Sequence, residues 1–265
     1  MTKTILITGA TDGIGLETAK MLAPLGHTLL LHGRNPDKLA AAATAVSGRD
    51  GAGTIETYRA DLTDLADVVA MADKIKAAYD SVDVLINNAG VFKMSNPVTR
   101  DGYDARFIVN VVAPYQLTKA LLPLIGPSGR VVNLSSAAQA PVNLEAFLTK
   151  QILPDGEAYA QSIRALTRWS AEMAYELGAT GPGIVAVNPA SFLASMMVKE
   201  AYGHEGHDLR IGADILTRAA LSDEFADASG RYYDNDRKAF AKPHPDALDS
   251  ARNKRIVAAL DQLIK

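Results

Sequence analysis

The sequence of 265 residues contains no cysteine. This absence excludes disulfide bonds, thiolate metal sites and a cysteine nucleophile, and it fits a reducing compartment. The first residues, "MTKTILITGA", enter a strand-like run and lack the apolar segment of a signal peptide. No uninterrupted apolar run reaches the ~18 residues that are typical of a membrane span. We therefore predict a cytoplasmic protein with no membrane partner.

An excess of charge of one sign is also lacking. The chain has 27 Lys and Arg against 30 Asp and Glu, a net charge of −3, and the two signs are interspersed. Without a basic face, nucleic acid is not expected as a partner. His204 and His207 stand close together in "GHEGHD", but polar residues of this kind are far more often a loop than a set of ligands. No metal site is predicted.

Apolar residues make up 48% of the chain, and they form short runs that alternate with longer helical patterns. The strand-like runs cover 3–8, 27–32, 54–59, 82–87, 130–135, 183–188 and 229–235. The helical patterns cover 14–24, 37–46, 64–79, 102–124, 157–178, 191–203, 208–221 and 245–265. This alternation predicts an α/β fold with a doubly wound parallel sheet that is covered by helices on both faces. Because no linker interrupts it, we predict a single domain over residues 1–265.

A glycine-rich segment, "TGATDGIG" at 8–15, follows the first strand and opens the first helix. Glycines at such a turn let the backbone approach a pyrophosphate, and the helix N-terminus offers free N–H groups. A glycine cluster alone also fits an ordinary turn, but its place between a strand and a helix favours dinucleotide binding. The residues predicted to hold the cofactor here are Gly9, Thr11, Asp12, Gly13, Ile14 and Gly15.

The second strand ends in Gly33, Arg34 and Asn35, without the carboxylate that often binds the ribose 2′-hydroxyl of NAD. Arg34 offers a guanidinium fork for a 2′-phosphate, although a solvated surface arginine is the alternative. Asp12 in the glycine loop argues slightly the other way. On balance these residues favour NADP(H) over NAD(H).

Several further motifs follow in a fixed order, namely "ADL" (60–62), "NNAG" (87–90), "VNVVAP" (109–114), "GRVVNLSS" (129–136), a tyrosine on a helix and "VNPAS" (187–191). With "TGATDGIG" they make the sequence resemble the short-chain dehydrogenase/reductase family over nearly its whole length. The strand tip "HGRN" is similar to the retinol dehydrogenase-like branch. The resemblance implies one Rossmann-type domain with a parallel sheet of about seven strands. It also implies an irregular substrate-loop region at 191–228.

The resemblance assigns further cofactor contacts. The pair at 61–62 matches residues that flank the adenine ring, and "NNAG" matches positions beside the adenosine ribose. Backbone contacts to the nicotinamide are expected after "VNP". The residues concerned are Asp61, Leu62, Asn88, Ala89, Gly90, Pro189, Ser191 and Phe192. Ala190 stands where the family often has glycine.

The resemblance also assigns catalytic roles. Asn110 matches the asparagine that supports a proton relay, Ser136 the serine that binds the substrate oxygen, and Tyr159 the general acid/base. Carbonyl reduction needs a hydride and a proton, and a phenol with an ordinary pKa of ~10 is a weak base at neutral pH. The family has a lysine one helical turn after the tyrosine, whose ammonium group favours the phenolate.

In this sequence the position of that lysine is Ile163, because the helix reads "YAQSI". Arg164 should face away from Tyr159, since adjacent helix residues point ~100° apart. Three explanations stay open. Ile163 is an engineered change, the natural enzyme uses another cation (Lys93, Lys150 or Lys199) or works slowly, or the protein binds NADP(H) as a sensor or scaffold without catalysis.

The substrate side is less specific. Ser136 and Tyr159 are 23 positions apart, and the long intervening segment is expected to pack over the cleft or to be a surface excursion. An apolar pocket is proposed from residues that equally suit an ordinary core, namely Met94, Phe147, Met196 and Met197. We predict a partly apolar alcohol or carbonyl as substrate. The resemblance further implies a homodimer or homotetramer that pairs the helices at 102–124 and 157–178.

Overall fold

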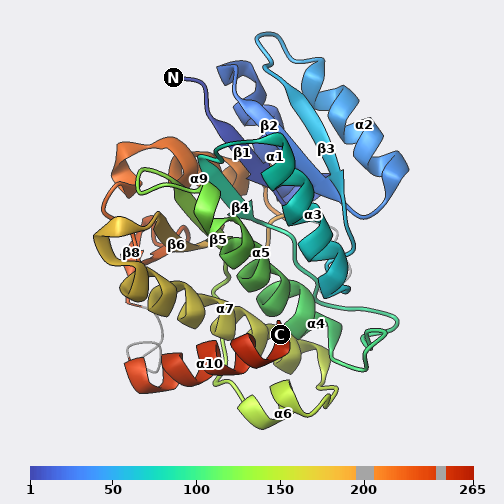
Figure 1. The fold of residues 1–265 in the computed structure, drawn as a ribbon, viewed down its shortest axis with the longest axis vertical. Helices are drawn as coiled ribbons and strands as arrows, with labels where there is room; N and C mark the ends of the chain where they lie inside the picture. Colours follow the sequence, from blue (N-terminus) through green and yellow to red (C-terminus); the bar gives the residue numbers. More distant parts are fainter. Residues whose placement is uncertain (195–205, 243–248) are drawn as a thin grey trace.

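The computed structural model describes residues 1–194, 206–242 and 249–265, and its centre is an eight-stranded sheet (Figure 1). The strand order is β3-β2-β1-β4-β5-β6-β7-β8. All neighbours pair in parallel except β7 and β8, which are antiparallel. The strands are β1 (Thr4–Ile7), β2 (Thr28–Gly33), β3 (Ile55–Arg59), β4 (Val84–Asn87), β5 (Arg130–Leu134), β6 (Gly183–Asn188), β7 (Tyr232–Asp234) and β8 (Ala239–Ala241).

The predicted doubly wound fold is confirmed, and β1 to β7 are the expected parallel strands. Strand β8 was not predicted. It has three residues and turns back on β7 after Lys238, whose φ is 51°. So short a run carries no periodic signal, and its strand conformation follows from its pairing with β7.

Two layers of helices cover the sheet because side chains alternate along each strand. Ile5 and Ile7 pack into the core under α1, α2 and α9, whereas Leu6 belongs to the core under α3, α5 and α7. The first layer is α1 (Gly13–Leu22), α2 (Pro36–Ser47) and α9 (Leu209–Leu221). The second layer is α3 (Leu65–Ala78), α5 (Ala113–Leu121) and α7 (Asp155–Leu177).

Helix α5 continues a longer helical run. It is preceded by α4 (Ala105–Phe107) and by a π-helical segment, η2 (Ile108–Val112). An 18-residue window of the run Ala105–Leu124 has a mean hydropathy of 1.3, so by length and composition this run is able to cross a membrane, which differs from the sequence expectation. However, 72% of that window is buried inside the fold, as in a core helix. The described 3-10 turns are η1 (Ala23–Leu25), η3 (Leu122–Leu124), η4 (Gly178–Thr180) and η5 (Asp223–Phe225).

Two further helices lie outside the second layer (Figure 1). Helix α10 (Ser250–Leu263) packs against α7, and Ile256 and Leu260 on it are fully buried. Asp261 at its end accepts hydrogen bonds from the Tyr115 hydroxyl at 2.8 Å and the Lys119 ammonium at 2.7 Å, both on α5. Helix α6 (Leu144–Leu148) comes from the long segment between β5 and α7 and packs against α10.

The predicted substrate-loop region at 191–228 is only partly irregular. Residues 209–221 form α9, which packs against α1 as one of the covering helices. Most of the predicted helix at 191–203, with Met196 and Met197, lies outside the described residues, as does the start of the predicted helix at 245–265.

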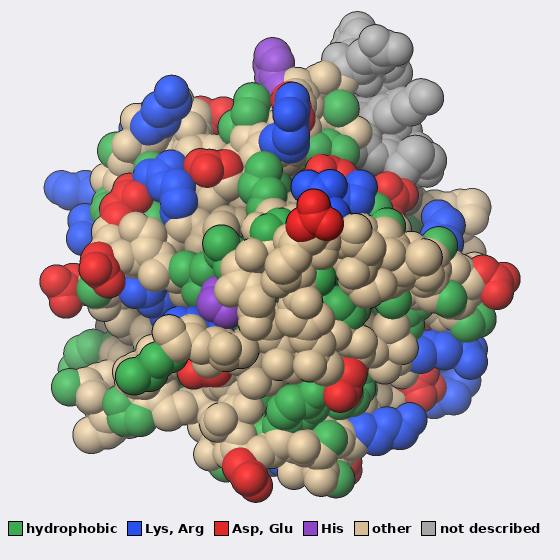
Figure 2. Space-filling view, turned by 90° about the horizontal axis from the view of Figure 1, so that it is seen from above, with side chains coloured by type: hydrophobic (Ala, Val, Ile, Leu, Met, Phe, Trp, Pro, Cys, Tyr) green, Lys and Arg blue, Asp and Glu red, His purple; other side chains and the backbone are tan. Residues whose placement is uncertain are grey.

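Charges of both signs lie at the surface. The face in Figure 2 shows acidic and basic side chains interspersed, without a continuous basic area. This distribution follows the near balance of charges in the sequence.

Candidate active site

The glycine loop lies where the strand order reverses, between β1 and β4. In parallel α/β sheets, ligands bind in the crevice at the carboxyl ends of the strands at this point. Gly9 has a φ of 65°, a left-handed conformation that favours glycine. A Cβ on Gly15 would lie 2.3 Å from the carbonyl oxygen of Gly9, so only glycine fits. This tightly packed turn, the glycine cradle, leaves no space for a side chain at residue 15, so the start of α1 lies directly against the loop.

Helix α1 begins at this cradle. Asp12 is its N-cap, and its carboxylate accepts the Gly13 N–H at 2.7 Å. The remaining N–H groups of the first turn face no helical partner, so they suit the pyrophosphate of a dinucleotide. Ile14 is only partly buried and packs beside Gly212 of α9. Asp12 thus caps the helix at the predicted cofactor site.

Two neighbouring elements hold the loop in place. The Asn88 side-chain amide donates to the carbonyls of Thr8 at 2.9 Å and Gly9 at 3.1 Å. The Gly9 N–H donates to Nδ1 of His32 at 3.2 Å, and Nε2 of His32 lies 3.1 Å from the Ala60 carbonyl. Because Nδ1 is an acceptor here, His32 is the neutral tautomer with its proton on Nε2. Burial lowers the pKa of His32 and keeps this form.

The tips of β2 and β3 place two arginines side by side. Gly33 pairs with Arg59 in the sheet, and Nε of Arg59 donates to the carbonyl of Arg34 at 3.3 Å. Both arginines are exposed at the edge of the crevice. A Cβ on Gly33 would lie 2.3 Å from the Thr11 methyl group, so this strand end must pack directly against the glycine loop. Arg59 was missed in the sequence because only the strand pairing brings it to Arg34.

Four predicted cofactor residues have local structural roles. Asn35 caps α2 by accepting the Lys38 N–H at 3.0 Å. Asp61 accepts the backbone N–H and hydroxyl of Thr63, at 2.9 and 2.8 Å. Leu62 is 7% exposed and packs in the core. Ala89 lies against Gly9, since a Cβ on that glycine would be 2.9 Å from its Cα.

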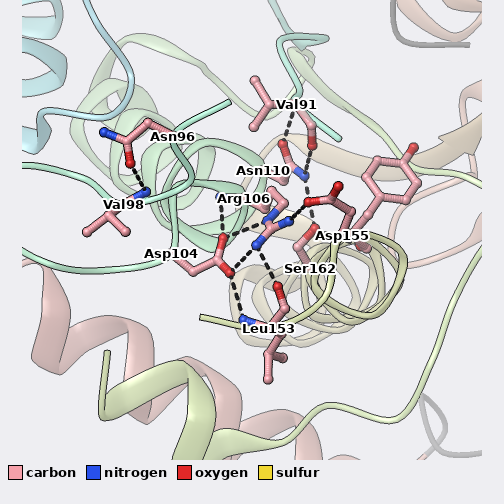
Figure 3. Close-up of polar contacts among 10 residues, drawn as sticks. Val91, Asn96, Val98, Asp104, Arg106, Asn110, Leu153, Asp155 and Ser162 are labelled. Atoms are coloured by element: carbon pink, nitrogen blue, oxygen red, sulfur yellow. Dashed lines mark hydrogen bonds and ion pairs between the residues drawn. The ribbon is translucent and has the colours of Figure 1, made fainter. Parts of the chain in front are cut away.

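Asn110 lies in the π-helical segment η2. Its side chain accepts the Val91 N–H at 2.8 Å and donates to the Val91 carbonyl at 2.9 Å (Figure 3). It also donates to the Ser162 hydroxyl at 2.9 Å. Asn110 is 3% exposed, so it does not face solvent as a mid-helix asparagine would. It therefore joins the segment after β4 to α7, three residues beyond Tyr159.

Ser136 lies just after the end of β5, and Tyr159 lies near the start of α7. Ser136 is partly exposed, whereas Ser135 is buried with its hydroxyl 2.9 Å from that of Thr167. The Ser136 carbonyl accepts the Tyr232 hydroxyl at 3.2 Å, which ties this segment to β7. The ring of Tyr159 is partly buried and lies edge-on to Phe92, with centroids 4.9 Å apart. Phe92 was not predicted because it belongs to no family motif.

Ile163 is 5% exposed and packs within the fold one turn after Tyr159. Arg164 is fully buried, and its Nη1 donates to Oε1 of Gln139 at 3.3 Å, in the segment after β5. Lys150 lies over the ring of Tyr103, 4.9 Å from its centroid. Lys199 is outside the described residues. Neither the contact of Arg164 with Gln139 nor that of Lys150 with Tyr103 involves Tyr159.

The turn after β6 has a strained backbone. Ala190 has a φ of 125° and Phe192 a φ of 54°, where side chains are disfavoured. Asp236, in the β7–β8 turn, accepts the Ser191 N–H at 2.8 Å and its hydroxyl at 2.7 Å. The carbonyl of Pro189 accepts the Asn235 amide at 2.9 Å. The hairpin thus holds the turn where nicotinamide contacts are expected.

The predicted apolar pocket stays a prediction, because Met196 and Met197 lie outside the described residues. Phe147 is 3% exposed and packs edge-on against Phe107, with centroids 5.1 Å apart, so it has the core role that the sequence left open. Helix α6, which carries it, packs against α10. Met94 is partly buried.

Sheet order, glycine cradle and helix N-terminus together define a dinucleotide-binding α/β protein. A sequence model of the short chain dehydrogenase family matches residues 3–205, and the chain belongs to this family. Human retinol dehydrogenase 13 is 29% identical over 99% of this chain and 84% of its own length. Human polyprenol dehydrogenase is 30% identical over 88% of this chain and 77% of its own length. These relatives place the chain in the retinol dehydrogenase-like branch of NAD(P)-dependent oxidoreductases.

Solved structures also have this fold along most of the chain. An uncharacterised protein from Mycobacterium paratuberculosis is 28% identical, with a TM-score of 0.82 over 99% of this chain and 93% of that chain. A short-chain dehydrogenase from Shigella flexneri in complex with NADP is 26% identical, with a TM-score of 0.70 over 88% of this chain and 97% of that chain.

Proposed function

We propose that the chain is an NADP(H)-dependent oxidoreductase that interconverts an alcohol and a ketone or aldehyde, and that Ile163 impairs it. The glycine cradle supports dinucleotide binding because it places the N-terminus of α1 directly after β1, where free N–H groups suit a pyrophosphate. The paired tips of β2 and β3 support NADP(H), since Arg34 and Arg59 offer two guanidinium groups for a 2′-phosphate. When bound, the nicotinamide would supply or accept the hydride at the carbonyl carbon.

The residues of this chain would handle the proton. Ser136 would donate a hydrogen bond to the substrate oxygen. Tyr159 would give its phenol proton to the oxygen as the carbonyl is reduced, and would take a proton from the alcohol in the reverse direction. Asn110 fixes the spacing between the segment after β4 and α7 through Val91 and Ser162.

The observation that carries the impairment is the buried aliphatic side chain of Ile163, one turn after Tyr159. Without an ammonium group there, nothing at that position favours the phenolate. Loss of general acid–base assistance typically costs about 10²–10⁴-fold in rate. We therefore propose that this chain is a slow or inactive form of the enzyme. The partly apolar substrate and the cytoplasmic location stay predictions.

The test is NADPH oxidation with a panel of aldehydes and ketones, measured for the unmodified chain and for Ile163→Lys. We expect turnover to rise by about 10²–10⁴-fold in Ile163→Lys. Ile163→Leu is the matched control, because it keeps an apolar side chain and should change nothing. If the unmodified chain already turns over at ordinary rates of ~1–10³ per second, the electrostatic argument is wrong.

A second candidate is a protein of the same fold that binds NADP(H) as a sensor or scaffold. Ile163 is the observation that favours it, since a binding protein needs no proton relay. Tight NADPH binding with no turnover, both in the unmodified chain and in Ile163→Lys, would support this candidate.

A further inference from the structure

Arg106 in α4 is fully buried, although it carries a charge. Its Nε and Nη2 donate to the two carboxylate oxygens of Asp104, at 2.8 and 2.7 Å. Its Nη1 donates to the carboxylate of Asp155, and Nη2 also donates to the carbonyl of Leu153 at 2.8 Å. Figure 3 shows the guanidinium between the two carboxylates. Burial alone would lower the pKa of Arg106, but these partners raise it, so the group stays charged.

This cluster holds the start of α7. The N-cap of α7 is Pro154, which makes no capping hydrogen bond from its side chain. Arg106 instead binds the residues on either side of Pro154, and Asp104 accepts the Leu153 N–H at 3.3 Å. A helix start without a side-chain cap therefore depends on a side chain from another element.

Arg106 and Asn110 act on opposite sides of Tyr159. They are four residues apart, hence one turn apart on the helical run formed by α4 and η2. Arg106 binds Asp155, one turn before Tyr159, and Asn110 binds Ser162, three residues after it. The helical run thus fixes α7 on both sides of the tyrosine.

We propose that Arg106 is a positioning residue for Tyr159, a role that rests on the proposed function. Asp104 and Asp155 are its two anchors. If the start of α7 shifts, the phenol shifts with it, and a displacement of about 1 Å at a reacting group can cost ~10²-fold in rate. The fork geometry predicts that lysine replaces Arg106 only in part, since it cannot bind both carboxylates in the same way.

The kinetic test compares Arg106→Gln with Arg130→Gln, both made in the unmodified chain and in Ile163→Lys. Arg130 is a matched control, because it also ties two elements through the carbonyls of Ala219 and Ser222, at the far end of β5. We expect Arg106→Gln to lower kcat by about 10–100-fold, with NADPH affinity within about 2-fold and little change in KM. Arg130→Gln should lower thermal stability without this change in kcat.

A second readout needs no turnover. In protein labelled with ¹³C-tyrosine, Tyr159→Phe assigns the Tyr159 resonance, and its titration with pH is followed by NMR. We expect Arg106→Gln to shift that resonance and its midpoint, and Arg130→Gln to leave both in place. Should Arg106→Gln fail to fold, Asp155→Asn replaces it, since the Asp155 side chain is 42% exposed and the asparagine keeps an acceptor.

The outcomes separate the two proposals. Turnover in Ile163→Lys with no effect of Arg106→Gln or Asp155→Asn, beyond that of the control, would overturn the positioning role and leave the function intact. No turnover in any form, with the NMR shift present, would overturn the function and keep the positioning of Tyr159. An unchanged Tyr159 titration in both variants contradicts the positioning role whatever the turnover.

Discussion

Ala190 has a φ of 125°, and its neighbours are held to Asn235 and Asp236 of the β7–β8 turn. A residue other than glycine in such a region costs about 1–3 kcal/mol, whereas glycine costs only ~0.5–1 kcal/mol in chain entropy. We expect Ala190→Gly to raise the free energy of unfolding in urea by about 1 kcal/mol. Ala171→Gly, inside α7, is the matched control and should lower it by ~1 kcal/mol. A loss of stability in Ala190→Gly would show that the turn is not strained.

His32 gives a pH dependence with a definite sign. Burial lowers its pKa below the ordinary 6.5, so the unfolded chain binds a proton more readily than the folded chain. The stability that the neutral ring contributes is present above ~6.5 and is lost as the pH falls below it. A proton on Nδ1 of the folded chain also displaces the Gly9 N–H, so NADPH affinity should be constant above ~6.5 and fall as the pH is lowered below it.

The control for this prediction is His27, whose pKa burial also lowers and whose Nδ1 accepts the Lys3 N–H at 3.3 Å, away from the glycine loop. Fluorescence titration with NADPH should lose acid sensitivity in His32→Gln and keep it in His27→Gln. Equal acid sensitivity in both variants would rule out His32 as its source.

At the scale of elements, the pairing of β2 with β3 brings together the two arginines that we propose to favour NADP(H). Because Gly33 pairs with Arg59, the Arg59 guanidinium lies beside Arg34. A hydrogen bond to a charged group contributes about 1.5–3 kcal/mol, so Arg59→Ala should weaken NADPH binding by at least ~10-fold. NADH lacks the 2′-phosphate, and its affinity should stay within about 2-fold. Arg49→Ala, another exposed arginine, should affect neither cofactor; a loss with both cofactors in Arg59→Ala would contradict the assignment.

At the scale of the whole molecule, α10 lies on the second layer of helices (Figure 1). The predicted homo-oligomer would pair the helices at 102–124 and 157–178, and α10 already binds both through Asp261, Ile256 and Leu260. We expect light scattering to give about 28.1 kDa, the mass of one chain. Leu260→Ala should cost about 2–5 kcal/mol and raise the dimer fraction by loosening α10. A stable dimer that Leu260→Ala leaves unchanged would show that α10 does not block pairing.

Local signals made much of the fold and part of the site predictable. "TGATDGIG" and "NNAG" are short segments whose glycines and turns act within a few residues, so their places at the ends of β1 and β4 were foreseen. The three-residue strand β8 was not, because its conformation comes from pairing with β7. Phe147 suited a pocket or a core equally by composition, and only its contact with Phe107 distinguishes them.

The sequence by itself determined the order of the first seven strands and of the helices that cover them, the glycine cradle, the tyrosine on its helix and the isoleucine one turn later. These features depend on spacing along the chain and on the types of neighbouring residues. The tertiary structure alone decided that Arg59 lies beside Arg34, that Arg106 binds the start of α7, and that Asp236 holds the turn at Ala190. Each pair is separated by at least 25 positions, so no local preference specifies it. Their contacts form only when burial of the two cores brings distant elements together.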